Sequence, residues 1–352
     1  MPVSEGVWKV GRDILIIALI TTVLGELGLR IYNHFNPVPI FYSDSYNRFR
    51  GKPFAPDWSS FHLNSKGFKD VEFSTAKAAG TVRILGIGDS FAFGVVPYEY
   101  NYLTLVEHDL RQSVHNVELI NMGIPGIGPR NYLSLLVQEG FALDPDRVLV
   151  SFFIGNDFDF EAQRRSLVSY SYAASLISYV VARRTKFEGQ IIHGSATYED
   201  DRPNFTDDAY LQLELQQSTI FLRNNPGFED RFAAALSYVS EMKRLCDYRN
   251  IALTVILIPD EMQVSRPLQS RVIAASGLGA ASFDFALPNR RLRAKLEELK
   301  IDYIDLTPEF ISRSLNETLY RPNDSHWNIA GNALAARLIW QHVSAQLGTV
   351  KK

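Results

Sequence analysis

A serine stands at the point where an apolar run of this sequence ends. Residues Arg83–Gly94 read RILGIGDSFAFG, so Ser90 directly follows the pattern of a buried strand. A dinucleotide fingerprint would need glycine in place of Phe91, a phosphate loop would need a Gly-Lys-Ser/Thr step, and a Gly-x-Ser-x-Gly elbow would need glycine in place of Ala92. The pattern that remains is a serine hydroxyl at the carboxyl end of a strand, where α/β proteins bind substrates.

A serine nucleophile needs a base, because its hydroxyl is barely ionised at neutral pH. Near the C-terminus the sequence reads RPNDSHWNIAGN, with Asp324 and His326 just before an amphipathic helix pattern. Residues two apart in an extended loop point the same way, so Asp324 is placed to orient the imidazole and to stabilise its charge once it holds the serine proton. Ser90, Asp324 and His326 therefore predict a catalytic triad in the order Ser, Asp, His.

Acyl transfer through a tetrahedral intermediate also needs hydrogen-bond donors for the oxyanion. Two further predicted strands end in such donors. Gly126, in NMGIPGIGPRN, can offer an unobstructed backbone N–H, and the side-chain amide of Asn156, in FFIGNDFDF, can donate. Because the carboxyl ends of parallel strands meet at one edge of a sheet, we predict an oxyanion hole made by Ser90 N–H, Gly126 N–H and Asn156.

From Val82 onward, short apolar runs alternate with longer helix-like segments, which indicates an α/β fold with a parallel sheet covered on both faces. The predicted strands are Arg83–Gly88, Val117–Met122, Arg147–Gly155, Ile251–Pro259 and Ile301–Leu306. The predicted helices are Tyr98–Val114, Arg130–Phe141, Arg231–Tyr248, Asn289–Leu299 and Asn328–Leu347.

Residues 160–230 interrupt this alternation and are too long for a simple connection. We expect a partly helical insertion over the sheet edge, which is either a lid or a passive surface elaboration. The pairs Arg164-Arg165 and Arg183-Arg184 are ordinary solvated charges in the passive interpretation, whereas in a lid they could meet an anionic substrate.

Residues 14–25 read ILIIALITTVLG and contain no charged side chain. With the residues that follow, up to Tyr32, this segment has about the length that spans a bilayer if Glu26 lies near one interface. No small-x-small cleavage site follows, so an uncleaved anchor is favoured over a removed signal peptide or a helix packed on the soluble domain. Lys9 and Arg12 precede the segment, which predicts a single-pass membrane protein with a cytoplasmic N-terminus and an extracytoplasmic catalytic domain.

The composition excludes some classes of protein. The chain has 352 residues and a formal net charge of −3, so it lacks the basic excess that nucleic-acid binding requires. Its single cysteine, Cys246, excludes an intrachain disulfide and a cysteine-based metal site. The sequence contains no metal-binding constellation, and the predicted chemistry needs neither a metal nor a cofactor.

The segments that carry Ser90, Gly126, Asn156 and His326 resemble the four blocks that name the SGNH superfamily, also called GDSL-type esterases and lipases. The resemblance covers residues 82–347 apart from the insertion. It implies a three-layer α/β/α, flavodoxin-like sandwich with a five-stranded parallel sheet, and it assigns Ser90 as nucleophile, His326 as base and the other two residues as oxyanion donors. The predicted domains are 1–32, a cytoplasmic tip and membrane anchor; 33–81, a linker with extended segments; and 82–347, the hydrolase-like domain with the insertion.

Two blocks depart from the family pattern. The family's Gly-x-Asn-Asp has Ile154 at its first position here and Gly155 at its second. The family's Asp-x-x-His has Asn323 three residues before His326, with Asp324 only two before, which makes the third triad member ambiguous. The Asp-Ser-His-Trp form is similar to SGNH-like proteins that transfer acetyl groups onto cell-envelope polysaccharides.

These patterns favour a serine-dependent acyl-ester hydrolase. An O-acyltransferase that uses a hydroxyl of an envelope or exported glycan as acceptor is the main alternative, because it would form the same acyl-enzyme. A third hypothesis is a non-catalytic envelope or glycan-binding protein on the same fold. The expected partners are an acyl ester, or an acylated glycan, and the membrane.

Overall fold

The computed structural model describes residues 5–36, 41–42, 45–57, 59–113, 116–159, 171–182 and 198–349. The chain divides into two compact units. The first contains residues 1–43 and 163–187, and the second contains residues 44–162 and 188–352. All residues of the predicted triad and oxyanion hole belong to the second unit.

The second unit is built on one sheet of five parallel strands in the order β2-β1-β3-β4-β5. The strands are β1 (Val82–Ile87), β2 (Val117–Asn121), β3 (Arg147–Phe153), β4 (Ala252–Ile258) and β5 (Asp302–Asp305). This is the flavodoxin-like order, with Ser90's strand between the two strands that lead to Gly126 and Asn156. The predicted fold class and the five-stranded parallel sheet are confirmed.

The described helices connect and cover this sheet. The α-helices of the second unit are α2 (Ser90–Phe93), α3 (Tyr102–Ser113), α4 (Pro129–Gln138), α6 (Asp207–Gln217), α7 (Pro226–Tyr248), α8 (Glu261–Val264), α9 (Arg266–Ser276), α10 (Leu287–Glu298), α11 (Thr307–Arg313) and α12 (Ile329–Thr349). Short 3₁₀ helices occupy Ser45–Arg48, Tyr98–Tyr100, Gly140–Leu143, Ser218–Phe221 and Ala280–Ser282.

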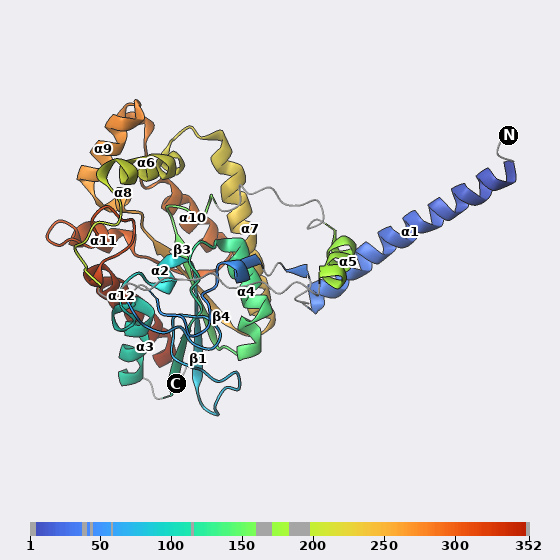
Figure 1. Ribbon diagram of the computed structural model, residues 1–352, viewed down its shortest axis with the longest axis horizontal. Helices are drawn as coiled ribbons and strands as arrows, with labels where there is room; N and C mark the ends of the chain where they lie inside the picture. Colours follow the sequence, from blue (N-terminus) through green and yellow to red (C-terminus); the bar gives the residue numbers. More distant parts are fainter. Residues whose placement is uncertain are drawn as a thin grey trace. The chain divides into compact units, whose positions relative to one another are not determined.

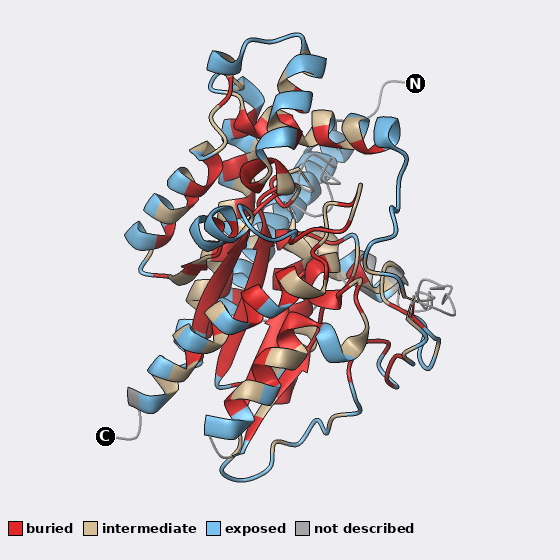
Figure 2. Cartoon of the chain, turned by 90° about the vertical axis from the view of Figure 1, so that its left-hand side faces the viewer, coloured by how far each residue is buried: buried red, intermediate tan, exposed pale blue. Residues whose placement is uncertain are grey.

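Helices lie on both faces of the sheet, which explains why most of the strands read as largely apolar runs. Figure 1 shows α3 and α12 on one side of the strands and α4 and α7 on the other. Every residue of β3 is buried, and Figure 2 shows the strands as the buried centre of this unit. The core between α3, α12 and the sheet includes Ile84, Leu149 and Ile256.

Several helix boundaries differ from the prediction. The helix expected from Tyr98 begins only at Tyr102, because the Asn101 side chain accepts the Leu103 N–H at 2.8 Å and donates to the carbonyls of Ala92 and Phe93 at 3.0 and 3.2 Å. This contact ties the start of α3 to the helix that carries Ser90. Helix α7 begins earlier than predicted, at Pro226, because proline is well suited to the first turn.

The first unit contains α1 (Glu5–Phe35) and α5 (Tyr172–Ala182). Within the described part of the chain, α1 is the one helix long and apolar enough to cross a membrane, over Gly6–Phe35. Arg164, Arg165, Arg183 and Arg184, which the sequence singled out, lie outside the described residues.

Candidate active site

Ser90 is the first residue of α2 and follows β1 after only two residues. Asp89 caps this short helix, since its buried carboxylate accepts the Phe91 N–H at 2.9 Å. Glycines make the turn possible. A Cβ at Gly88 would lie 2.8 Å from the Ser151 Cβ, and one at Gly123 would lie 2.2 Å from the Phe93 backbone nitrogen. The chain therefore presses α2 against the neighbouring strand and loop, with Ser90 at the edge of the sheet.

The structure brings together the three residues of the predicted triad. The Ser90 Oγ lies 2.7 Å from Nε2 of His326, and Nδ1 of His326 lies 2.6 Å from Oδ1 of Asp324. With Nδ1–H donated to the carboxylate, Nε2 is left as the acceptor for the serine proton. This arrangement can generate a serine nucleophile.

The turn at Asn323 decides that Asp324, and not Asn323, faces the imidazole of His326. Asn323 has a left-handed backbone, with φ of 48°, and its side chain donates to the Phe205 carbonyl and to Asp207, at 3.3 and 2.6 Å. It therefore points away from His326. Asp324 instead accepts both the ring Nδ1–H and, at 3.1 Å, the backbone N–H of His326 on one oxygen.

An aromatic cluster holds the histidine against the serine. Trp327 is buried, and its ring lies 4.9 Å from Phe91, 5.7 Å from Tyr102 and 5.0 Å from Phe310. The Phe91 ring also lies 5.0 Å from the His326 ring. Because Phe91 follows the serine and Trp327 follows the histidine, packing of this pair fixes the two catalytic candidates relative to one another.

Asp324 is buried but well supplied with donors. Its second oxygen accepts from the Asn204 amide and, at 3.2 Å, from Arg321. Burial by itself raises the pKa of Asp324, but His326, the hydrogen bonds and Arg321 outweigh it, so the pKa lies below its ordinary value. The carboxylate is thus ionised where the histidine works as a base.

His326 lies between two acids. Its side chain is 23% exposed, so one side remains open to solvent. Burial lowers the pKa of His326, but the charge and hydrogen bond of Asp324 raise it more, and Asp89 adds to the rise. Burial raises the pKa of Asp89 itself to about 6, and its Oδ2 has no hydrogen-bond partner among the described residues.

The two predicted oxyanion donors follow the strands on either side of β1. Gly126 comes after β2 with φ of +73°, a conformation that favours glycine, and Phe49 is the nearest neighbour to the space where its Cβ would be. Asn156 comes after β3, and its Oδ1 is buried without a hydrogen-bond partner in the described parts of the chain. Strand order alone brings both to the edge that carries Ser90.

Two bonds of Asp157 fix the turn that carries Asn156. The buried Asp157 carboxylate accepts the Phe153 N–H at 2.9 Å and the Tyr132 hydroxyl at 2.9 Å. A Cβ at Gly155 would lie 2.4 Å from Oδ2 of Asp260, so this position is closed to larger residues. Glycine at position 155 therefore has a steric reason.

Sequence reasoning missed Asn204 and Arg321, which support Asp324, and Lys69. Lys69 is buried, forms a 2.5 Å ion pair with Asp57, and donates to the carbonyls of Gly94 and Val96 at 2.9 and 2.6 Å. Those carbonyls lie just after the end of α2, so Lys69 fixes the backbone behind Ser90. No local pattern distinguishes these three residues from surface ones, because their partners are distant in the sequence.

The chain has a matching family model for its C-terminal part. Residues 217–352 match the SGNH hydrolase-like domain of acetyltransferase AlgX. Over this part of its length the chain is similar to an SGNH hydrolase-like domain. None of the curated proteins compared with it matches.

Several solved structures are similar to this chain at low sequence identity. An acetyl xylan esterase, AlAXEase, is 17% identical with a TM-score of 0.41, covering 74% of this chain and 100% of that one. A lipase/acylhydrolase from Enterococcus faecalis is 18% identical with a TM-score of 0.37, covering 76% and 97%. A GDSL-like lipase from Bacteroides thetaiotaomicron is 12% identical with a TM-score of 0.39, covering 75% and 88%.

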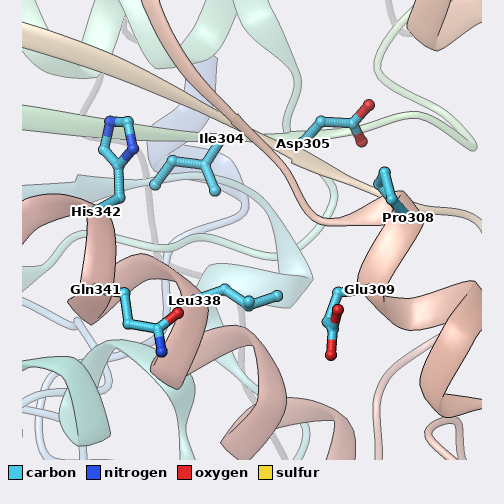
Figure 3. A pocket seen from close by; sticks show the side chains of 7 residues that line it. All are labelled: Ile304, Asp305, Pro308, Glu309, Leu338, Gln341 and His342. Carbon is cyan, nitrogen blue, oxygen red and sulfur yellow. The ribbon is translucent and has the colours of Figure 1, made fainter.

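A surface cavity of about 430 Å³ lies elsewhere on the second unit, and it is not lined by the triad. Figure 3 shows its lining side chains from β5, α11 and α12, among them Asp305, Glu309 and His342. Among the described residues, no group of three or more His, Cys, Asp and Glu side chains could hold a metal ion.

Proposed function

We propose that this protein is a serine-dependent enzyme that takes an acyl group from an ester onto Ser90 and passes it to an acceptor. The observation that carries the proposal is the chain of two hydrogen bonds, 2.7 and 2.6 Å, from Ser90 through His326 to Asp324. A non-catalytic binding protein has no use for a serine held in this way.

Each step uses groups that are already in place. Ser90 attacks the ester carbonyl while its proton passes to Nε2 of His326, and Asp324 stabilises the imidazolium. Ser90 N–H, Gly126 N–H and the Asn156 amide hold the negative oxygen of the tetrahedral intermediate. The C–O bond to the leaving alcohol then breaks, and His326 protonates the departing alkoxide. The acceptor O–H repeats the sequence and releases the acyl group from Ser90.

Two acceptors define two candidate functions. Water makes the protein an ester hydrolase, which is the function that the sequence favoured. A sugar hydroxyl makes it an O-acetyltransferase acting on a cell-envelope or exported glycan. The second candidate is favoured by one observation, the match of residues 217–352 to the SGNH domain of an acetyltransferase. Helix α1 supports a membrane-anchored enzyme. Lys9 and Arg12, which precede its apolar segment, favour a catalytic domain that faces away from the cytoplasm.

The choice of acceptor and the acyl-enzyme itself can both be tested on the purified chain. The purified chain is incubated with 4-nitrophenyl acetate, with and without an acetylatable oligosaccharide, and both free acetate and acetylated sugar are measured. Acetylated sugar formed in preference to acetate supports the transferase, and acetate alone supports the hydrolase. If a fluorophosphonate fails to label the folded wild type at Ser90, the acyl-enzyme proposal itself is wrong.

A further inference from the structure

Helix α1 contains a carboxylate at a depth where a membrane would surround it. At about 1.5 Å per residue, Glu26 lies about 20 Å along the helix from Asp13 and about 6 Å before Arg30. The hydrocarbon layer of a bilayer is about 30 Å thick. If α1 crosses a membrane with Asp13 at one surface, Glu26 lies inside the hydrocarbon, about 10 Å from the other surface. A carboxylate at this depth is costly unless it is paired.

The partner of Glu26 is the start of helix α5, from the insertion. Its two oxygens accept the backbone N–H groups of Tyr172 and Ala173, at 3.0 and 2.9 Å, and the hydroxyl of Ser171 at 2.9 Å. Arg30, one turn further along α1, donates to the same carboxylate at 2.6 Å. A helix N-terminus is a favourable site for a negative charge, so Glu26 caps α5 while α5 compensates Glu26.

Helix α5 is unsuited to water. It reads YAASLISYVVA and has no charged side chain. Ile177 and Val180 are each 65% exposed in the structure. A surface helix of a soluble domain normally presents a charged or strongly polar face to the solvent. The polar side chains of α5 are hydroxyls only, those of Tyr172, Ser175, Ser178 and Tyr179.

The surrounding sequence and aromatic contacts fit a helix in the outer part of the lipid layer, near the membrane surface. Residues 166–182 carry no charge and are bracketed in the sequence by Arg164-Arg165 and Arg183-Arg184. Arginines in such flanking positions can reach lipid phosphates. Tyr172 stacks on Phe41, with ring centroids 4.4 Å apart, in the kind of aromatic cluster found at membrane interfaces.

We propose that α5 lies in the lipid beside α1, so that the chain enters the bilayer at two places joined by the Glu26 carboxylate. The partner of α5's apolar surface is the acyl region of an anionic phospholipid bilayer. This inference rests on the proposed membrane anchoring by α1. It assigns part of the insertion to the membrane rather than to a lid over Ser90.

Site-directed spin labelling of the full chain tests this directly. In a Cys246→Ser background, single cysteines replace Ile177 in α5, Ile17 in α1 and Leu315, which is 72% exposed beyond α11. The chains are reconstituted into phosphatidylethanolamine–phosphatidylglycerol vesicles. Accessibility of each nitroxide to oxygen, which concentrates in lipid, is compared with accessibility to a water-soluble nickel chelate.

The three positions separate the possible results. We expect the labels at Ile177 and Ile17 to favour oxygen and the label at Leu315 to favour nickel. A nickel-favouring label at Ile177 beside an oxygen-favouring label at Ile17 overturns the inference but leaves the anchor. A nickel-favouring label at Ile17 as well overturns the anchor and the inference together, and neither result bears on the chemistry of Ser90.

Two further measurements complete the test. Glu26→Gln removes the charge with little change in shape, and we expect Ile177 to lose its excess oxygen accessibility while Ile17 keeps it. An unchanged Ile177 would overturn the role of the carboxylate. The native chain, which needs no cysteine variants, is exposed to a photoreactive diazirine phospholipid and digested. Labelled peptides should include Tyr172–Ala182, and their absence beside labelled α1 peptides contradicts the inference.

Discussion

The serine and the aspartate of the triad are held in place in different ways. Lys69 supports the serine, and Asn204 and Arg321 support the aspartate. At the nucleophile end, Lys69 binds the carbonyls of Gly94 and Val96 and so fixes the backbone behind Ser90. At the acid end, Asn204 and Arg321 bind the Asp324 carboxylate itself. Lys69 therefore fixes only the position of Ser90, whereas Asn204 and Arg321 fix the position of the Asp324 carboxylate and also stabilise its negative charge.

We expect the contacts of Lys69 to matter mainly for the stability of the fold and the contacts of Asp324 to matter mainly for catalysis. The Lys69–Asp57 ion pair is buried, and breaking it leaves an uncompensated charge in the core. The donors to Asp324 contribute less to folding, but they keep the acid ionised and therefore set how strongly it supports His326. Variants at the two ends should consequently fail in different assays.

The largest effect on the rate is expected from removing the serine hydroxyl or the imidazole. Ser90→Ala and His326→Ala should each lower kcat by a factor on the order of 10⁴–10⁶, because members of a triad act as a unit. Release of 4-nitrophenol from 4-nitrophenyl acetate measures the loss, and thermal unfolding checks that both variants fold. Retention of more than a tenth of the activity in a folded Ser90→Ala variant would be incompatible with the proposed acyl-enzyme.

Asp324→Asn isolates the acid. We expect kcat to fall by about 10³–10⁴, because an amide cannot hold the same tautomer or stabilise the imidazolium. Asn323→Ala is the matched control, since the Asn323 side chain faces Phe205 and Asp207. It should retain activity within about threefold, because it does not contact the imidazole. Equal losses in the two variants would mean that the adjacent residues share the role.

Asn156→Ala tests the proposed oxyanion hole, in which Asn156 lies outside the triad. A loss of about 10²–10³ in kcat with KM nearly unchanged is expected, because the amide would act mainly in the transition state. Steady-state kinetics on the same ester provide both constants. An effect confined to KM would assign Asn156 to substrate binding.

Asn204→Ala tests whether the hydrogen bond from Asn204 to Asp324 affects catalysis. Losing one donor to the carboxylate should cost about tenfold in kcat/KM. The pKa of Asp324 lies below its ordinary value, and removing a donor raises it toward that value. The carboxylate also holds the imidazolium more strongly when it has fewer other partners, so the acidic limb of the pH–kcat/KM profile should move to higher pH. Asn323→Ala loosens the same segment without touching Asp324 and should leave the limb in place.

Lys69→Met should have the smallest effect on the rate and the clearest effect on stability. The free energy of unfolding is expected to fall by about 3–5 kcal/mol, because Asp57 is left buried and unpaired. Urea unfolding measures this loss, while kcat of the folded fraction stays within about threefold. The double variant Lys69→Met/Asp57→Asn should recover part of the stability. No recovery would show that the charge of Asp57 is not the cause.

The sheet could be predicted because buried parallel strands have an unmistakable composition. Strands such as β3, which is buried at every residue, read as mostly apolar runs, and a helix pattern follows further along the chain. Helices α8, α9 and α11 were not predicted, and α6 was expected only as part of a partly helical insertion. For α8 a signal was present, since Asp260 and Gln263 form a capping box. In the others, short helices on the surface lack a long apolar period.

The sequence alone determined which chemical groups the site contains and in what order the chain delivers them, because strand ends and helix starts are local patterns. It left open whether Asn323 or Asp324 faces the imidazole, and the left-handed turn at Asn323 decided this. Only the tertiary structure joined Asn204 to Asp324, across 120 residues, and Lys69 to the backbone behind Ser90. Such contacts depend on loops closing over long distances, and a hydrogen bond between distant residues leaves no periodic trace in either segment.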